Sequence, residues 1–119
     1  MSALQLDLKQ FYGSETFTRW SPLFNDVLTE GCEYVAEKAQ AFWLFDYISS
    51  HLNELSDDLV VTTLTVRPEN DAILALTNGD GEPLRTQRIE FTDFPEGELI
   101  IWSAKNELGA YTHMLPSEY

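Results

Sequence analysis

The carboxylate of Asp46 is the side chain in this sequence that most clearly suggests chemistry. It lies in an apolar run, residues 41–47 (AFWLFDY), and on a helical wheel it falls beside Ala39 and Phe42, on the face expected to meet the core. Burial makes a carboxylate costly unless it is paired, and it raises the pKa toward the range of a general acid or base. One hypothesis for Asp46 is therefore acid–base catalysis.

The alternative for Asp46 is a structural role. Its carboxylate would then accept hydrogen bonds from Arg19, from Arg67, from a tryptophan N–H or from backbone amides of residues 16–28. We favour this alternative because no second carboxylate or histidine has a spacing that ties it to Asp46.

His51, His113 and Cys32 are the other candidates for chemistry, and they are the only histidines and the only cysteine in the chain. Their spacing matches neither H-x-x-x-H nor C-x-x-C, so we expect no metal and no cofactor. A single cysteine also excludes an internal disulfide. Cys32 at the start of a helix would have a lowered pKa if it were a nucleophile, but a small apolar packing role is the simpler expectation.

The aromatic residues are more numerous than one helix–sheet interface of this size requires, since they make up 13% of the chain. A surplus of aromatic rings can line a ligand pocket or a dimer face. If a pocket lies between a helix and the sheet, we expect these residues to line it: Asp46, Trp43, Trp20 and Trp102.

The charge of the chain is strongly negative. Seven Lys and Arg stand against twenty Asp and Glu, giving a net charge of −13. This balance disfavours binding to nucleic acid or to anionic membranes, since both need a basic surface. It leaves two interpretations open: solubility, or a surface that meets a basic partner and can replace DNA phosphates there. The candidate partner-binding acids fall in predicted loops and turns: Glu54, Asp57, Asp58, Asp80, Glu82, Glu96 and Glu98.

Two helices are expected to come first in the chain. Leu4, Leu8 and Phe11 have the spacing of one face of a short N-terminal helix. Thr29 is a suitable N-cap for a second, long helix over residues 32–52, which contain neither Gly nor Pro. The apolar residues in the second half of this helix run around its circumference, so we expect it to be buried on most sides.

Strands are expected to follow. β-branched and alternating segments predict strands at 59–67, 72–77, 85–91, 98–104 and, less strongly, 110–115. Asn78–Gly81 is a turn signal, and the short connections indicate an antiparallel meander. The fold class is therefore α+β: a short N-terminal helix and one long buried helix packed on an antiparallel sheet of four to five strands, forming a single domain over residues 1–119.

Four segments carry a resemblance to a known family. They are 8–15 (LKQFYGSE), 33–46 (EYVAEKAQAFWLFD), 91–95 (FTDFP) and 115–119 (LPSEY). In this order they resemble a small bacterial family of unknown function. Gln40 stands where that family favours a small residue, and Phe45 where it favours Leu. The resemblance implies an accessory role, since such proteins are common on plasmids and other mobile elements, but it implies no activity, cofactor or site residue.

We therefore expect a small, acidic, non-enzymatic protein-interaction module whose partner is a basic protein. One form would be an inhibitor of the anti-CRISPR or anti-restriction type, which competes with nucleic acid for a nucleic-acid-binding complex. The alternatives are a small-ligand binder or enzyme, and a homodimeric structural module that pairs through an exposed strand such as 85–91. The absence of a signal-peptide pattern and of a long apolar run predicts a cytoplasmic protein and no membrane association.

Overall fold

The computed structural model describes residues 17–21 and 24–118. The helix expected at Leu4, Leu8 and Phe11 lies outside the described residues.

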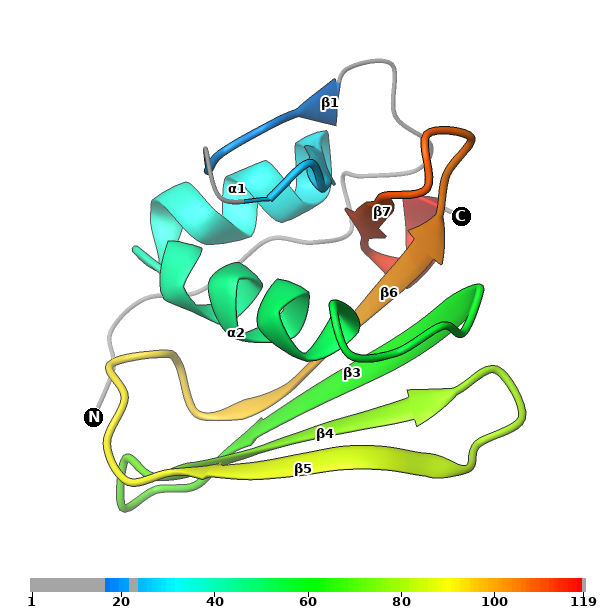
Figure 1. Ribbon diagram of the computed structural model, residues 1–119. Coiled ribbons are helices and arrows are strands. Elements are labelled where there is room, and N and C mark those ends of the chain that lie inside the picture. Colours follow the sequence, from blue (N-terminus) through cyan, green and yellow to red (C-terminus); the bar gives the residue numbers. More distant parts are fainter. Residues whose placement is uncertain (1–16, 22–23, 119) are drawn as a thin grey trace.

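The described residues form one seven-stranded sheet with helices on one of its faces (Figure 1). The strands are β1 (Phe17–Thr18), β2 (Val27–Thr29), β3 (Leu59–Val66), β4 (Ala72–Asn78), β5 (Pro83–Ile89), β6 (Gly97–Lys105) and β7 (Tyr111–Met114), and their order is β1-β2-β7-β6-β3-β4-β5. The helices are α1 (Glu30–Lys38) and α2 (Phe42–Leu52), and a 3-10 turn, η1 (Pro116–Glu118), follows β7. The α+β class is confirmed, whereas the sheet is larger than the four to five strands expected.

The sheet is not the expected meander. β6 pairs with β3 instead of its neighbour in sequence, β5, and β2 pairs with β7 in parallel. The chain leaves edge strand β5 and crosses to the far side of β3, so β3 becomes a central strand with partners on both sides. β5 begins two residues earlier than expected, at Pro83. β1 and β2 were not expected because two or three residues are too short to show a period.

Buried and more exposed side chains alternate along the central strands, and the buried ones form the core between the sheet and the helices. Val60 and Leu64 of β3 and Leu74 of β4 are buried, while their sequence neighbours are more exposed. They join one apolar cluster with Phe45 and Ile48 of α2. The helix and the strands therefore share the core that fixes the position of α2.

The expected long helix is broken at Gln40. The backbone N–H of Ala41 donates to the carbonyl oxygen of Ala36 at 2.8 Å, and the N–H of Gln40 donates to that of Glu37 at 3.4 Å. This is the Schellman pattern, which ends a helix with one residue in the left-handed region. Gln40 takes that conformation, with φ +50°. The break was missed because the usual signal, a glycine at this position, is absent.

Replacing Gln40 with glycine should stabilise the protein. A side chain in the left-handed region costs about 1 kcal/mol relative to glycine. We therefore expect Gln40→Gly to raise the free energy of unfolding by about 0.5–1 kcal/mol, measured by urea denaturation. Gln40→Ala is the control: it keeps the backbone strain and should give no gain. A destabilised Gln40→Gly variant would contradict this account of the break.

The C-terminal segment holds the start of α1. Thr29 is the N-cap, as expected, and accepts the N–H of Cys32 at 3.4 Å. The buried Glu118 carboxylate accepts the hydroxyl of Thr29 at 2.6 Å and the backbone N–H groups of Gly31 and Leu115, each at 3.0 Å. A Cβ on Gly31 would lie 2.5 Å from Glu118 Oε1, so only glycine fits there. Leu115 and Glu118 thus contribute a structural clamp at the start of α1.

None of the helices in the described part of the chain has the length and apolar character needed to span a bilayer.

Candidate functional site

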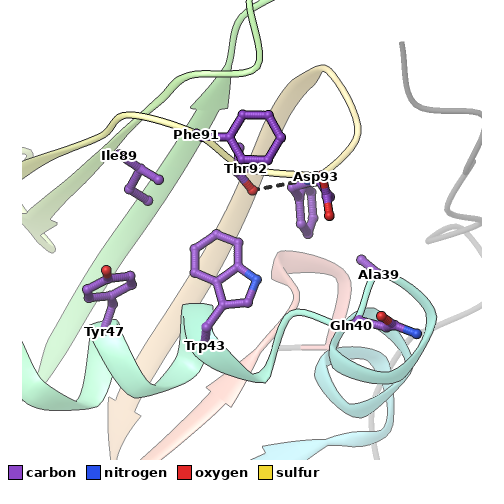
Figure 2. A pocket seen from close by; sticks show the side chains of 9 residues that line it. Ala39, Gln40, Trp43, Tyr47, Ile89, Phe91, Thr92 and Asp93 are labelled. Carbon is purple, nitrogen blue, oxygen red and sulfur yellow. Dashed lines mark hydrogen bonds between the residues drawn. The ribbon is translucent and has the colours of Figure 1, made fainter.

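A groove lined by aromatic residues lies between the start of α2 and the β5–β6 loop, residues 90–96 (Figure 2). We call it the aromatic groove. Its volume is about 360 Å³, in the range of small-ligand and side-chain pockets. The lining residues are Ala39, Gln40, Trp43, Tyr47, Ile89, Phe91, Thr92, Asp93 and Phe94.

The rings of the groove come from both walls. On α2, Trp43 and Tyr47 are one helical turn apart, and their rings meet edge to face with centroids 6.0 Å apart. On the loop, Phe94 is buried in the core while Phe91 is 67% exposed. In Figure 2 the indole of Trp43 rises from the helix toward the loop that carries Phe91. A large exposed ring beside a half-buried one is a common feature of binding sites.

Hydrogen bonds fix the loop wall of the groove. The N–H of Thr92 donates to the carbonyl oxygen of Asn70 at 2.7 Å, and the N–H of Phe94 donates to Thr92 Oγ1 at 3.0 Å. Asn70 and Gln40 are the two non-glycine residues with positive φ in the described part of the chain. One lines the groove and the other holds its loop. Such strained conformations gather at binding sites, where a fixed shape has functional value.

The groove lies in a negatively charged part of the molecule. Residues 89–104 contain no Lys or Arg. The β5–β6 loop carries three exposed acids, Glu90, Asp93 and Glu96. Asp93 and Gln40 lie at one end of the groove, and Tyr47 and Ile89 lie at the other, with Trp43 between them (Figure 2). The groove therefore combines ring faces with a carboxylate at one end.

The four residues expected to line a pocket do not line one pocket together. Of these, Trp43 lines the aromatic groove. Asp46 is exposed instead of facing the core, because the break at Gln40 changes the face that α2 turns inward. Its Oδ1 accepts the indole N–H of Trp20 at 2.9 Å, which is the tryptophan bond of the structural alternative. Trp102 alternates with buried neighbours on β6, so its side chain lies on the sheet face away from the helices.

The seven candidate partner-binding acids fall at two ends of the sheet. Five of them lie in the α2–β3 loop and the β4–β5 turn, which are adjacent because Val60 pairs with Asn78: Glu54, Asp57, Asp58, Asp80 and Glu82. Glu96 lies in the groove loop and Glu98 follows it on β6, at the other end of the sheet, since Glu98 pairs with Thr65. Figure 1 shows the β4–β5 turn and the β5–β6 loop at opposite ends of the strands. The seven acids therefore do not form one continuous surface.

A buried chain of polar side chains links α2 to β6 and β7. The Ser49 hydroxyl lies 2.5 Å from Asp26 Oδ2 and 3.0 Å from His113 Nε2, and the Ser103 hydroxyl lies 2.7 Å from His113 Nδ1. The backbone N–H of Tyr111 donates to Asp26 Oδ1 at 2.9 Å. His113 and both serines are fully buried. Asp26 thus supplies the buried carboxylate of this network, and it was not among the residues that the sequence singled out.

The hydrogen bonds of this buried network define which atoms carry the protons. Asp26 accepts from Ser49, so Ser49 accepts from Nε2–H of His113, and Nδ1 then accepts from Ser103. Burial lowers the pKa of His113, and the nearby Asp26 opposes this effect without outweighing it. Burial alone would raise the pKa of Asp26, but its contacts with His113, Ser49 and the Tyr111 N–H hold it below the usual value. This buried network of hydrogen-bonded side chains therefore contains a neutral imidazole, that of His113, and an ionised carboxylate, that of Asp26.

Because the pKa of His113 is lower in the folded state, acid should weaken the fold. Below about pH 6.5 the unfolded chain binds a proton that folded His113 does not, so stability falls as the pH decreases below this value. Because the pKa of Asp26 is lowered in the folded state, its ionised carboxylate continues to stabilise the fold until the pH falls below about 4. We expect the urea midpoint to fall from pH 7 to pH 5, and this fall should be smaller in His113→Asn. Equal slopes in the two proteins would contradict the assignment.

The remaining chemical candidates have structural partners. Burial raises the pKa of Cys32 well above its usual value, so the thiol is not activated by the helix start and packs as an apolar residue. His51 Nε2 lies 2.9 Å from Gln87 Oε1 on β5. Among the described residues no group of three His, Cys, Asp or Glu side chains is placed to hold a metal ion.

β5, the strand expected to offer a dimer face, is an edge of the sheet. It carries Pro83, Arg85 and Arg88, and prolines and charges on an edge strand oppose pairing with another chain. Arg88 approaches Asp71 at 3.5 Å, and the Arg85 side chain donates to the carbonyl oxygen of Leu84 at 2.7 Å. These features do not favour dimer formation through β5.

The fold and groove together define an α+β protein in which two helices cover one face of a mixed sheet and an aromatic groove opens beside the second helix. The chain belongs to a family of unknown function (DUF6876), whose family model matches residues 2–119. The resemblance expected from the four segments is thus confirmed. Comparison with curated proteins and with solved structures found no match.

Two of the four segments that carry the resemblance meet at the groove. Ala39, Gln40 and Trp43 come from 33–46, and Phe91 to Phe94 come from 91–95. Trp43 was expected to line a pocket, whereas the rings of the loop were not. The signal that could have identified them was the segment FTDFP, an aromatic and acidic loop. Its position next to α2 depends on the unexpected path of the chain from β5 to β6.

Proposed function

We propose that this protein is a small, acidic, non-enzymatic interaction module that binds a basic partner protein through the aromatic groove. The observation that carries the proposal is the groove itself: an exposed ring on a fixed loop faces a half-buried ring on α2, and acids lie along the loop. Aromatic side chains supply most of the binding energy at many protein interfaces, and complementary charge supplies orientation and rate.

The net charge supports the choice of partner. A protein with a charge of −13 repels acidic partners and attracts basic ones over distances near the Debye length, about 10 Å at 0.1 M salt. The acids at the groove end are Glu90, Asp93, Glu96 and Glu98, and they would contact the partner directly. The acids at the other end, in the α2–β3 loop and the β4–β5 turn, would act through long-range attraction.

A binding role also agrees with the burial of the serine, histidine and aspartate side chains that form the network between α2, β6 and β7. Ser49, Ser103 and His113 are fully buried, so a substrate could not reach them without a large rearrangement of the core. The neutral imidazole has both of its nitrogen atoms in hydrogen bonds to serine hydroxyls. We therefore assign this buried network of side chains to stability and propose the groove as the functional site.

A narrower form of the proposal is that the basic partner binds nucleic acid and that this protein inhibits it. The support is the density of carboxylates on a rigid scaffold, which can occupy a groove made for phosphates. Binding of an inhibitor of this kind weakens steeply as the salt concentration rises and is lost when the nucleic acid already occupies the partner. Both dependences can be measured once a partner has been identified.

The proposal predicts that defined basic peptides bind at the groove. A random dodecapeptide library selected on the full chain should yield peptides of net positive charge. Phe91→Ala should weaken the best of them about tenfold, because truncating an exposed interface ring typically costs more than 1 kcal/mol. Binding can be measured by calorimetry. Since Phe91 is 67% exposed, its removal should leave the urea midpoint nearly unchanged.

Leu108→Ala is the matched control, because Leu108 is a large apolar residue that is 91% exposed in the β6–β7 turn. This variant should bind the selected peptides as the wild-type protein does. Neutral or acidic peptides from the selection would contradict the proposed function. So would basic peptides that bind Phe91→Ala with undiminished affinity.

A further inference from the structure

We infer that the aromatic groove holds the side chain of a single arginine from the partner's basic segment, which anchors the complex. This inference rests on the proposed function and specifies the chemistry of its site. It depends on three features of the groove: the arrangement of its rings, the carboxylate at one end, and the polar acceptor beside that carboxylate.

The rings favour a cation. A guanidinium or ammonium group is attracted to the face of an aromatic ring within about 6 Å of its centroid, and tryptophan is the strongest ring for this contact. Trp43 stands in the middle of the groove, and Tyr47 meets it at an interplanar angle of 81° (Figure 2). A side chain that lies along the groove would therefore pass over the indole, with Phe91 on the opposite wall.

The carboxylate supplies the counter-charge. Asp93 lines the end of the groove, and its loop is fixed by the hydrogen bonds of Thr92, so the carboxylate does not need to be brought in from elsewhere. Glu90 and Glu96 flank it on the same loop. The nearest cations in sequence, Lys38 and Arg88, do not line the groove, and Arg88 approaches Asp71 at 3.5 Å instead. The carboxylate of Asp93 therefore offers a counter-charge to a cation of the partner.

The shape selects arginine over lysine. Arginine has a planar head that stacks on rings and donates several N–H bonds in fixed directions, whereas the ammonium of lysine is a compact, strongly hydrated charge. The groove offers a ring face at Trp43 and two oxygen acceptors at one end, the carboxylate of Asp93 and the side-chain amide of Gln40. Tyr47 and Ile89 at the other end provide an apolar wall for the methylene stem.

The test uses N-acetyl-Gly-Arg-Gly-amide as a probe of the full-length chain. Arginine should give a saturable shift of the Trp43 indole N–H signal in a ¹H–¹⁵N spectrum, with the signal assigned by its loss in Trp43→Phe. The matched tripeptide with citrulline has nearly the same shape without the charge and should bind about fivefold more weakly. Lysine and leucine tripeptides should also bind more weakly. Asp93→Asn should reduce binding of the arginine peptide to the level of the citrulline peptide.

The indole of Trp20 is an internal control, because its N–H donates to Asp46 and it does not line the groove. Its signal should stay in place throughout the titration. Equal binding of arginine and citrulline peptides, or a shift of Trp20 without one of Trp43, would overturn the inference. The two proposals fail separately: loss of the selected basic peptides at Phe91→Ala together with no preference for arginine would refute this inference but not the proposed function.

Discussion

Replacing Asp26 with alanine is expected to lower the free energy of unfolding by about 3–5 kcal/mol. The variant removes the acceptor of the Ser49 hydroxyl and of the Tyr111 backbone N–H, both in the interior. Each buried donor left without an acceptor costs about 1–3 kcal/mol, and breaking a buried charged network by removing one partner costs about 3–5 kcal/mol. Urea denaturation at pH 7 measures the loss.

Replacing Asp26 with asparagine should cost far less, because the hydrogen-bond chain can reverse. The new side-chain N–H₂ group would donate to Ser49, Ser49 would donate to His113 Nε2, and His113 Nδ1–H would donate to Ser103. The carbonyl oxygen of asparagine can still accept the N–H of Tyr111. We expect a loss of about 1 kcal/mol, the net value of an ordinary hydrogen bond.

The histidine tautomer distinguishes this explanation from a general loss of packing. In the wild-type protein ¹⁵N chemical shifts should show His113 protonated at Nε2, and in Asp26→Asn they should show it protonated at Nδ1. An unchanged tautomer, or equal losses of stability for alanine and asparagine, would show that the chain of hydrogen bonds is not directed by Asp26.

The second large effect is expected at Glu118. Glu118→Ala removes the acceptor of the Thr29 hydroxyl and the Gly31 N–H at the start of α1, and of the backbone N–H of Leu115 after β7. It also removes a negative charge from a helix N-terminus, where the helix dipole favours an anion. We expect the free energy of unfolding to fall by about 2–4 kcal/mol, measured by urea denaturation.

Glu118→Gln should be nearly as damaging, in contrast to the mild effect expected for Asp26→Asn. Both oxygens of the Glu118 carboxylate face backbone N–H groups, which cannot turn around to accept a hydrogen bond. Whichever way the glutamine amide is placed, its N–H₂ group meets another donor. A Glu118→Gln variant as stable as the wild-type protein would contradict the clamp.

The sequence predicted those parts of the fold that have a clear period. β3, β4 and β6 were found because β-branched and apolar residues alternate over seven to nine positions. The order of the strands was not predicted, because the β5–β6 loop gives no sign that it carries the chain to the other side of β3. The parallel pairing of β2 with β7 joins segments more than eighty residues apart and has no local signal.

The candidate site was predicted only in part, for a related reason. Trp43 was expected to line a pocket and it lines the aromatic groove. Asp46 was expected in the core because the helical wheel treated residues 32–52 as one continuous helix. The left-handed conformation of Gln40 ends the first helix, so α2 turns a different face toward the core. Phe91 comes to the groove through tertiary contacts alone, so no spacing in the sequence could pair it with Trp43.

The acids at the groove should contribute more to binding of the basic partner than the same number of acids at the opposite end of the sheet. Two triple variants test it with equal changes in charge: Glu90→Gln/Asp93→Asn/Glu96→Gln at the groove, and Glu54→Gln/Asp58→Asn/Glu82→Gln at the opposite end, all on exposed residues. We expect calorimetry with the best selected basic peptide to show about a tenfold loss of affinity for the groove variant and a loss below about threefold for the other. Equal losses in both variants, or a larger loss at the opposite end, would contradict the account.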